Sequence, residues 1–351
     1  MPFVVRDVFG GATAEEIAAV LNEFCRCSLG SDIERSELFY ASVGCVCGVR
    51  LRDGRRVVVK VHRPETSIGF LAAMQTAQQT LAASGFPCPE PLAGPTALAR
   101  GVAVAESLLD WGEGADAHDP EIRRAMAQTL ARLVARCRGP SGLDGLHHGL
   151  MVRQEGNLWP RPHDRRFDFE ATRRGAEWID AVATNARRVL DGVGAGEWVV
   201  GHTDWRVGNM RFSGGEVSVV YDWDSLRIMR EPELIGSTAH LFTADWAVRD
   251  RRQLPTLEET LAFASDYERA RGAAFTAEEE RILRAGLTYS MGYTARCEHA
   301  DLVSDFGRPP VSPESSTVPA GTARAFLAAH AAELLDTAIG AVPTIGPAVR
   351  R

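Results

Sequence analysis

The sequence predicts an α+β protein with two lobes, a small strand-rich lobe followed by a larger helical lobe. Three observations support this prediction. Residues 37–106 contain several β-branched runs separated by turn signals, with one helical stretch among them. From residue 119 onward, helix-start signals dominate. The 351 residues, with 45% hydrophobic and 24% charged side chains, suffice for one large domain or two lobes that share a cleft.

The N-terminal lobe is predicted from turn chemistry and from β-branched runs. Thr13, followed three residues later by Glu16, has the capping-box pattern and predicts a helix that extends to about Cys27. The Asp53-Gly54 pair between two apolar runs predicts a hairpin. Strands are expected at 38–40, 45–49, 56–61 and 101–105, and a helix is expected at 68–83.

The C-terminal lobe is predicted mainly from helix starts. Asp119-Pro120 is an N-cap followed by proline, and it begins a helix that extends to about Arg138. Thr256 and Thr276 each open a capping box at a further helix start. Further helices are expected at 177–190 and 322–339, short strands at 198–200 and 217–221, a turn at 213–215, a loop-rich region at 139–170 and an exposed loop at 309–319.

These elements divide the chain into four expected parts. They are an N-terminal helical extension (1–30), the strand-rich lobe (31–109), the helical lobe (110–340) and a frayed tail (341–351). No internal repeat is visible in the sequence.

Composition makes small molecules the default partners. The formal charge is −7 with no basic stripe, which argues against nucleic acid or an anionic membrane surface as the main partner. No apolar stretch approaches the roughly 18 residues of a membrane span, and the N-terminus has no leader pattern. We therefore expect a soluble, cytoplasmic protein. The seven cysteines, with Cys25/Cys27 and Cys45/Cys47 as close pairs, fit reduced, buried thiols rather than a zinc site.

Lysine usage is unusual. Of 39 basic residues, 38 are arginine, and Lys60 is the only lysine. Arginine is a broad planar fork, whereas lysine is a slim point charge on a flexible stem. A composition that favours arginine so strongly predicts that Lys60 stands where a guanidinium does not fit. A lysine that falls there by chance is the alternative.

Polar side chains gather at the ends of two predicted strands. His202-Thr203-Asp204-Trp205-Arg206-Val207-Gly208-Asn209 follows the first strand, and Asp222-Trp223-Asp224 follows the second, 13 residues after Asn209. Strand ends that lead into loops present side chains on a rigid backbone, and carboxylate and amide oxygens are the ligands that magnesium prefers. Each residue alone fits an ordinary turn or N-cap, but the ordered set indicates a catalytic site.

These two segments resemble those of the aminoglycoside phosphotransferase-like family, small-molecule kinases with the protein-kinase fold. The family pattern is His-Gly-Asp-x-x-x-x-Asn, followed by Asp-Trp-Glu or Asp-Phe-Asp. The resemblance extends over about residues 37–300, with VVVK ending at Lys60 as the third strand and VAVAESL at 102–108 as the strand that enters the hinge. It implies a two-lobed protein-kinase-like fold in which 31–109 bind the nucleotide and 110–340 carry the catalytic loop and the acceptor site.

The resemblance also implies a role for each matching residue. Asp204 would be the catalytic base that orients a substrate hydroxyl, and Lys60 would bind the α- and β-phosphates. Asn209 and Asp222 would hold Mg²⁺ against the phosphates. Backbone groups near Glu106 and Leu108 would contact the adenine, so their side chains would matter little. The nucleotide would be ATP, with GTP not excluded.

The sequence departs from the family pattern at four places. The helix at 68–83 has no glutamate to pair with Lys60, so either Gln75 substitutes through a neutral hydrogen bond or the lysine is held differently. The hairpin at 41–45 has a single glycine. Arg206 could act on the transferring phosphoryl group or form a structural ion pair, and we favour the ion pair. The segment at 231–236 lacks the aspartate that the family places near Ile235, which leaves open how the catalytic loop is anchored.

The leading functional prediction is a phosphotransferase that moves the γ-phosphoryl group of a nucleoside triphosphate to a hydroxyl of a small molecule. The acceptor would be an antibiotic, aminoglycoside-like or other, or a metabolite such as a sugar or an amino alcohol. Residues 231–305 carry 14 acidic and 8 basic side chains, which weakly favours a cationic acceptor, although helix starts explain many of these acids equally well. A nucleotide-binding pseudoenzyme is the competing hypothesis.

Overall fold

The structure is a computed structural model that describes residues 3–138, 143–149, 156–164, 166–192, 195–248, 250–304, 317–319, 321–336 and 344–346. It divides into two compact units, each built from separate stretches of chain. The first unit contains Met1–Gly112, Gly139–Leu146 and Ser218–Asp224, and the second contains Glu113–Arg138, His147–Val217 and Ser225–Arg351. The segment Ser218–Asp224, which contains Asp222, belongs to the first unit.

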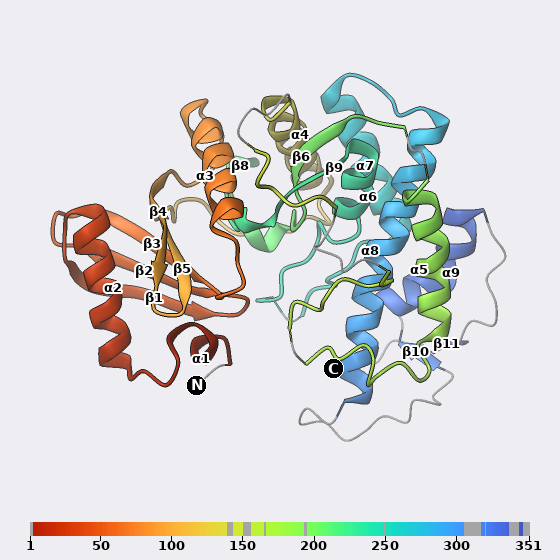
Figure 1. Ribbon diagram of the computed structural model, residues 1–351. Helices are drawn as coiled ribbons and strands as arrows, with labels where there is room; N and C mark the ends of the chain where they lie inside the picture. Colours follow the sequence, from red (N-terminus) through yellow and green to blue (C-terminus); the bar gives the residue numbers. More distant parts are fainter. Residues whose placement is uncertain are drawn as a thin grey trace. The chain divides into compact units, whose positions relative to one another are not determined.

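The first unit is built on a five-stranded antiparallel sheet with the order β1-β2-β3-β5-β4. The strands are β1 (Ile33–Ala41), β2 (Cys45–Leu51), β3 (Arg56–His62), β4 (Pro91–Leu98) and β5 (Gly101–Ser107). Helices α1 (Phe3–Phe9) and α2 (Ala14–Leu29) pack on one face of this sheet (Figure 1). Their apolar side chains form one core with inward-facing residues of β2, β3 and β5.

Strand alternation decides which face each side chain takes. In β3, Val57, Val59 and Val61 are buried in the core beneath α1 and α2. Lys60 is therefore on the opposite face of the sheet. Val58 stands opposite Glu106 of β5, and Lys60 stands opposite Val104, so Lys60 and Glu106 are diagonal neighbours on that second face.

Helix α3 (Ile68–Ala83) lies beside β4 in the same unit (Figure 1). It begins at Ser67, whose hydroxyl accepts a hydrogen bond from the main-chain nitrogen of Phe70, as an N-cap serine does. Its bounds agree with the helix predicted at 68–83. The helix turns Gln78 inward, where that side chain is 1% exposed.

The second unit is mainly helical and is organised around α8, whose neighbours include α5, α6 and α9 (Figure 1). The helices are α4 (Pro120–Arg136), α5 (Glu177–Leu190), α6 (Glu231–Ala239), α7 (Leu257–Arg271), α8 (Ala277–Val303) and α9 (Ala323–Leu335). The predicted capping boxes of Thr256 and Thr276 are both formed, with Glu259 and Glu279 as reciprocal partners.

Short strands present the polar segments found in the sequence. Strand β6 (Trp198–His202) pairs antiparallel with β9 (Leu226–Arg230), and β7 (Met210–Ser213) pairs with β8 (Glu216–Val220) in a hairpin. Asp204 follows β6, and Asn209 ends the short 3₁₀ turn η1 (Val207–Asn209) just before β7. Asp222 follows β8, just before the 3₁₀ turn η2 (Trp223–Ser225).

Several elements differ from the sequence prediction. The structure adds α1, β4, β7, β9 and α6, which the sequence analysis did not predict. In the expected loop at 309–319, residues 309–316 lie outside the described residues, and Thr317–Pro319 form strand β10. The expected frayed tail contains strand β11 (Thr344–Gly346), which pairs in parallel with β10.

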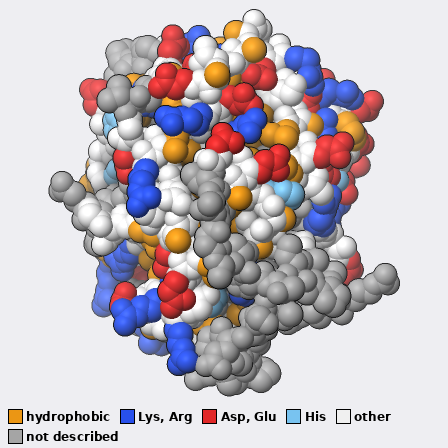
Figure 2. Space-filling view, turned by 90° about the vertical axis from the view of Figure 1, so that its right-hand side faces the viewer, with side chains coloured by type: hydrophobic (Ala, Val, Ile, Leu, Met, Phe, Trp, Pro, Cys, Tyr) orange, Lys and Arg blue, Asp and Glu red, His pale blue; other side chains and the backbone are white. Residues whose placement is uncertain are grey.

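No helix among the described residues is long and apolar enough to cross a membrane. All seven cysteines are free, and six of them are buried, as expected for small apolar side chains. Figure 2 shows basic and acidic side chains interspersed over the coloured part of the face that it draws.

Candidate active site

The loop after β6 holds Asp204 in a fixed orientation. The Asn209 side-chain nitrogen Nδ2 donates hydrogen bonds to Oδ2 of Asp204, 2.7 Å away, and to its main-chain oxygen, 2.9 Å away. The Arg206 Nε lies 3.0 Å from Oδ1 of the same carboxylate. The Asp204 side chain remains 28% exposed. The arrangement therefore leaves a charged, oriented carboxylate that solvent or a substrate can reach.

Trp205 anchors this loop from within. Its side chain is 1% exposed, and its indole Nε1 donates to the main-chain oxygen of Met126 in α4, 3.3 Å away. The His202 ring packs edge-on against Trp205, with 5.7 Å between the ring centroids. The main-chain nitrogens of Val207 and Gly208 donate to Phe242 and Ala244. These contacts fix the loop without the aspartate that is missing from 231–236.

His240, at the C-terminal end of α6, is the titratable group of this region whose pKa is most clearly displaced. Burial lowers its pKa to about 4, against opposing effects of a contact with the Ser237 main-chain oxygen and of the Asp204 charge. The imidazole is therefore neutral at pH 7. Nothing in the sequence pattern indicated a residue of this kind near Asp204.

The second polar segment is anchored by Trp223 and has unusual backbone geometry at Asp222. Asp222 has a φ of +68°, in the left-handed region, which costs energy for a residue other than glycine and is often found at functional sites. Trp223 is fully buried, and its Nε1 donates to the main-chain oxygen of Val220, 2.8 Å away. The Trp223 ring packs edge-on against Phe86. Both segments thus place an aspartate beside a buried tryptophan.

Lys60 of β3 is paired with a carboxylate of the adjacent strand β5. Its Nζ lies 2.9 Å from Oε1 of Glu106, and the two side chains are 13% and 6% exposed. The other carboxylate oxygen, Oε2, accepts a hydrogen bond of 3.0 Å from Gln78 Nε2 of α3. The same Gln78 nitrogen is 2.8 Å from the main-chain oxygen of Pro89. A buried chain of contacts therefore connects α3 to β5 and β3.

Several anions surround the Lys60 ammonium within the first unit. Burial by itself lowers the pKa of Lys60, but the carboxylates of Glu106, Asp224 and Asp222, in that order, outweigh it and hold the pKa above its usual range. His62 Nδ1 lies 3.6 Å from Oδ2 of Asp224. Burial lowers the pKa of His62. Lys60 is therefore charged at neutral pH.

The structure favours the second alternative for holding this lysine and corrects the expectation about the Glu106 side chain. Gln75 does not steer Lys60, because its Nε2 donates to the main-chain oxygen of Ala93 in β4. The side chain of Glu106 does matter, since it is the one that pairs with Lys60. The sequence did not indicate this role, because it depends on the register between β3 and β5. In that register Glu106 is opposite Val58, two residues before Lys60, so Lys60 and Glu106 share one face of the sheet.

The expected adenine contact at Glu106 and Leu108 is limited by the sheet. Glu106 lies between Val58 and Pro91 in the strand ladders, and the main-chain nitrogen of Leu108 donates to Arg56. A contact with adenine at Leu108 would have to use its carbonyl oxygen or its side chain. The Leu108 and Leu38 side chains converge over Gly48, where an added Cβ would lie 2.9 Å and 2.7 Å from them. Glycine at 48 therefore gives the Leu38 and Leu108 side chains room to pack over β2.

Asn209 and Asp222, the two predicted metal ligands, each offer an oxygen atom of the kind that a hard divalent cation prefers. The Asn209 amide nitrogen is committed to Asp204, so its Oδ1 oxygen is the atom that a cation could bind. Asp222 offers a carboxylate. No group of three or more His, Cys, Asp or Glu side chains suited to a metal occurs among the described residues. Such a group is not needed for Mg²⁺, which usually binds one or two protein oxygens and takes its other ligands from water and phosphate.

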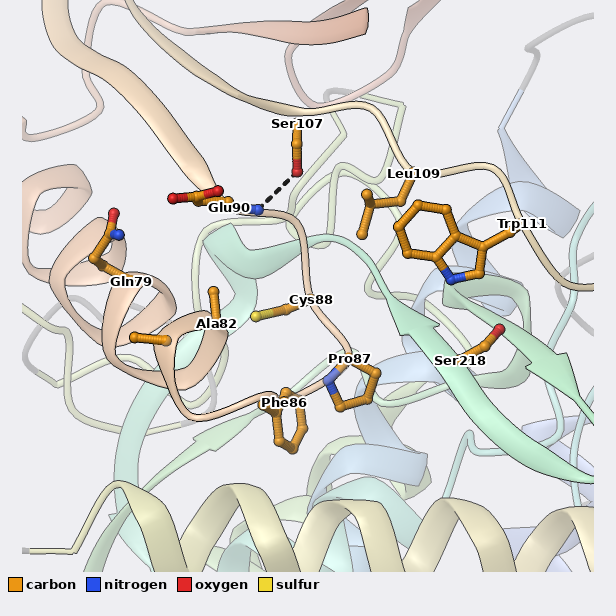
Figure 3. A pocket seen from close by; sticks show the side chains of 11 residues that line it. Gln79, Ala82, Phe86, Pro87, Cys88, Glu90, Ser107, Leu109, Trp111 and Ser218 are labelled. Atoms are coloured by element: carbon orange, nitrogen blue, oxygen red, sulfur yellow. Dashed lines mark hydrogen bonds between the residues drawn. The ribbon is translucent and has the colours of Figure 1, made fainter.

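A separate cavity of about 370 Å³ lies in the first unit (Figure 3). In Figure 3, Phe86, Pro87 and Cys88 line one side, and Leu109 and Trp111 face them across the opening. The side chains of Lys60, Glu106 and Asp222 are not among its lining. This cavity is therefore separate from the group formed by Lys60 and its neighbouring carboxylates.

The acidic excess at 231–305 is largely used within the fold. Glu231 is buried against Tyr267 and Arg271, and Asp266 is buried against Arg123. The carboxylates of other acids in this stretch accept hydrogen bonds at helix starts or pair with arginines, among them Glu259, Glu279, Glu280, Glu298 and Asp301. These contacts remove most of the support that the charge count gave to a cationic acceptor.

Comparison with known proteins finds that the chain is similar to phosphotransferases. Residues 48–279 match the model of the "Phosphotransferase enzyme family". A solved amicoumacin kinase in complex with AMP-PNP, Ca²⁺ and Ami is similar, with a TM-score of 0.61 and 14% identity over 92% of this chain and 96% of that chain. No curated protein matches.

Two further solved structures are similar at lower scores. A spectinomycin phosphotransferase in complex with ADP and spectinomycin has a TM-score of 0.51 and 12% identity, with 84% of this chain and 96% of that chain covered. An ethanolamine kinase from Plasmodium vivax has a TM-score of 0.50 and 12% identity, with 84% and 86% covered. At these identities the likeness establishes the fold alone, and it confirms the predicted α+β, protein-kinase-like class.

Proposed function

Because the chain belongs to the phosphotransferase enzyme family, we propose that it transfers the γ-phosphoryl group of ATP to a hydroxyl group of a small molecule. The observation that carries this proposal is the orientation of Asp204 by Asn209 and Arg206 at the end of β6. A carboxylate held by two donors and still exposed suits a group that positions a hydroxyl for in-line attack. Membership in the family confirms the resemblance noted in the two polar segments.

In the proposed reaction, the acceptor oxygen forms a bond to the γ-phosphorus while the bond from that phosphorus to the β–γ bridging oxygen breaks. ADP leaves, and the hydroxyl proton passes to a carboxylate oxygen of Asp204. Lys60 binds the α- and β-phosphates as a fixed positive charge. The metal roles of Asn209 and Asp222 are assigned on the chemistry of each side chain, and Mg²⁺ supplies neutralisation of the phosphate charge.

We propose an antibiotic as the acceptor, with a metabolite such as a sugar or an amino alcohol as the second candidate. The support is fold likeness to an amicoumacin kinase and to a spectinomycin phosphotransferase, whereas an ethanolamine kinase supports the second candidate. The acids at 231–305 do not separate these acceptors, because their contacts lie within the protein. GTP remains the alternative donor.

A nucleotide-binding pseudoenzyme is the competing function, and the contacts of Asp204 argue against it. Binding alone requires a cation site and Lys60. It does not require a second, exposed carboxylate held in place by an asparagine and an arginine. The oriented Asp204 therefore favours catalysis.

Two variants and one control test the proposal. Calorimetry with a non-hydrolysable ATP analogue and Mg²⁺ should show binding to Asp204→Asn close to that of the wild type and no Mg²⁺-dependent binding to Asp222→Ala. Product mass spectrometry with a panel of hydroxylated antibiotics and metabolites should show transfer lowered by orders of magnitude in Asp204→Asn. Asp53→Asn, which changes an aspartate in the exposed 52–55 turn, is the matched control for both assays. Loss of nucleotide from Asp204→Asn but not from Asp222→Ala would reverse the two assignments.

A further inference from the structure

We propose that Glu106 of β5 is the residue that positions Lys60 for the nucleotide phosphates, in place of a glutamate on helix α3. The inference rests on the proposed function, because it assigns Lys60 to phosphate binding. Helix α3 contains no acidic residue at all, so a carboxylate partner for Lys60 cannot come from that helix. Glu106 is a positioning residue in this proposal, since it acts through Lys60.

The pairing follows from the strand register. Lys60 and Glu106 are diagonal neighbours on adjacent antiparallel strands, on the sheet face opposite α1 and α2. Their charged atoms lie 2.9 Å apart and are almost completely buried. In a buried site, removal of one partner of an ion pair leaves an uncompensated charge, which is strongly unfavourable.

Both oxygens of the Glu106 carboxylate are engaged. Oε1 contacts Lys60, and Oε2 accepts from Gln78, which also donates to the Pro89 main-chain oxygen. Glu106 is therefore held from two sides and cannot rotate away from Lys60 without breaking a buried hydrogen bond. Gln78 supplies the contact to α3 that a helix glutamate would otherwise make directly.

This arrangement has a consequence for the phosphate site. Three carboxylates, those of Glu106, Asp222 and Asp224, attract the one ammonium. Pairing with Glu106 keeps the ammonium on the β5 side instead of drawing it onto Asp222, the proposed metal ligand. Because both partners belong to one sheet, the pair forms without any movement of α3, unlike a pair formed between a strand and a helix.

The single lysine makes the pair observable directly. Protein grown with ¹⁵N-lysine gives one side-chain ammonium resonance, that of Lys60. In Glu106→Gln this resonance should shift and exchange its protons with water faster, because the ammonium loses its buried partner. Glu37→Gln is the matched control, since Glu37 is a half-buried glutamate of the same sheet that pairs with Arg50 and Arg56. The resonance should be unchanged in that variant.

Nucleotide affinity gives the second readout. Calorimetry with Mg²⁺ and a non-hydrolysable ATP analogue should show affinity lowered by about a hundredfold in Glu106→Gln, near the lower end of the cost of truncating one partner of a buried charge pair in a binding site. The double variant Glu106→Gln/Gln78→Glu exchanges the two side chains that share this hydrogen bond, so that the carboxylate is on α3. Its nucleotide affinity should be at least about tenfold higher than that of Glu106→Gln. Gln78→Ala should lose part of the affinity, whereas Gln75→Ala, which removes a contact to Ala93 only, should match the wild type.

The outcomes separate this inference from the proposed function. If the wild type binds nucleotide and Glu106→Gln binds it as well as Glu37→Gln does, the inference is overturned and the function stands. A wild type that binds no nucleotide overturns the proposed function. The position of the Lys60 resonance is independent of binding, and a resonance that does not move in Glu106→Gln overturns the inference in either case. Recovery by the double variant excludes a purely structural role, because a folding defect would not be repaired by moving the charge.

Discussion

The Arg206 Nε lies 3.0 Å from Oδ1 and 3.1 Å from Oδ2 of Asp204, two residues earlier in the same loop. The Arg206 Nε therefore donates to both oxygens of the carboxylate. Gly208 makes room for the guanidinium, since a Cβ at that position would lie 2.6 Å from Nη1 of Arg206. Of the two roles open to Arg206 from the sequence, this geometry supports the ion pair.

Arg206 should therefore affect transfer more than nucleotide binding. In Arg206→Ala the Asp204 carboxylate loses one of its two orienting donors, and we expect the rate of transfer to fall by about tenfold to a hundredfold, since a misplacement of 1 Å can cost about a hundredfold. Arg206→Lys should recover little, because a point charge cannot reproduce the planar guanidinium contact. ADP release under saturating nucleotide, together with calorimetric affinity, checks both variants. A loss of affinity equal to the loss of rate would assign Arg206 to the phosphates instead.

Lys60→Arg should lower transfer about as severely as Lys60→Ala. The site is buried and enclosed by Glu106 and by the neighbouring carboxylates, so the wider guanidinium would displace the phosphates even though it keeps the charge. Stability should separate the two variants. Lys60→Arg should stay within about 1 kcal/mol of the wild type, whereas Lys60→Ala, which leaves Glu106 unpaired, should lose about 3 to 5 kcal/mol. Steady-state kinetics and denaturant melts measure these quantities, and full activity in Lys60→Arg would contradict the argument from lysine usage.

The elements that sequence predicts well are those with strong local signals. The bounds of α3 and α5 agree with prediction, and Thr13, Thr256 and Thr276 cap helices as expected. The elements that sequence missed depend on partners distant in the chain. Strand β4 begins at Pro91 in a proline-rich segment and is an edge strand, where a missing N–H is tolerated. Strand β9 pairs with β6 and bridges to His148, both of which are distant from it in the sequence.

The candidate site shows the same division. The order of Asp204, Asn209 and Asp222 identifies the segments, because those residues follow one another at fixed spacing. The partner of Lys60 could not be found in this way, since it depends on the register between β3 and β5. In the sequence, Gln75 is a candidate partner because α3 has no glutamate, whereas in the structure Glu106 contacts Lys60 and Gln78 donates a hydrogen bond to Glu106. Pairing of strands, rather than residue type, decided which side chain was available.

Trp205 should be required for a stable catalytic loop. Trp205→Phe keeps most of the ring packing and removes the hydrogen bond to Met126, so we expect a loss of about 1 kcal/mol in the free energy of unfolding. Trp205→Ala should cost about 3 to 5 kcal/mol, because it leaves a cavity at a fully buried position. Denaturant unfolding measures both values. Trp198→Ala, at an exposed tryptophan of β6, is the control and should cost less than Trp205→Ala. Equal losses would show that the loop does not depend on the buried ring.

Glu298 gives the protein a pH-dependent contribution to stability at the start of α9. Its carboxylate accepts hydrogen bonds from the main-chain nitrogens of Ala323 and Arg324, 2.9 Å and 3.1 Å away. Burial raises the pKa of Glu298 to about 7, although these two hydrogen bonds and the Arg324 charge oppose the shift. The unfolded chain releases this proton near pH 4.5, so between pH 4.5 and 7 the folded state binds more protons.

Stability contributed by Glu298 therefore falls as the pH rises from 4.5 to 7. Glu298→Gln has an uncharged side chain throughout this range. Between pH 4.5 and pH 7, the difference in free energy of unfolding between this variant and the wild type should therefore shift in favour of the variant by about 1 to 3 kcal/mol, given about 1.36 kcal/mol for each pKa unit. Comparison of the two proteins at each pH cancels the opposite contribution of His299, whose pKa burial lowers to about 4. Glu280→Gln, at an exposed position of the same helix, is the control and should show no such trend. A difference between wild type and Glu298→Gln that stays constant from pH 4.5 to 7 would mean that Glu298 titrates alike in the folded and unfolded chains.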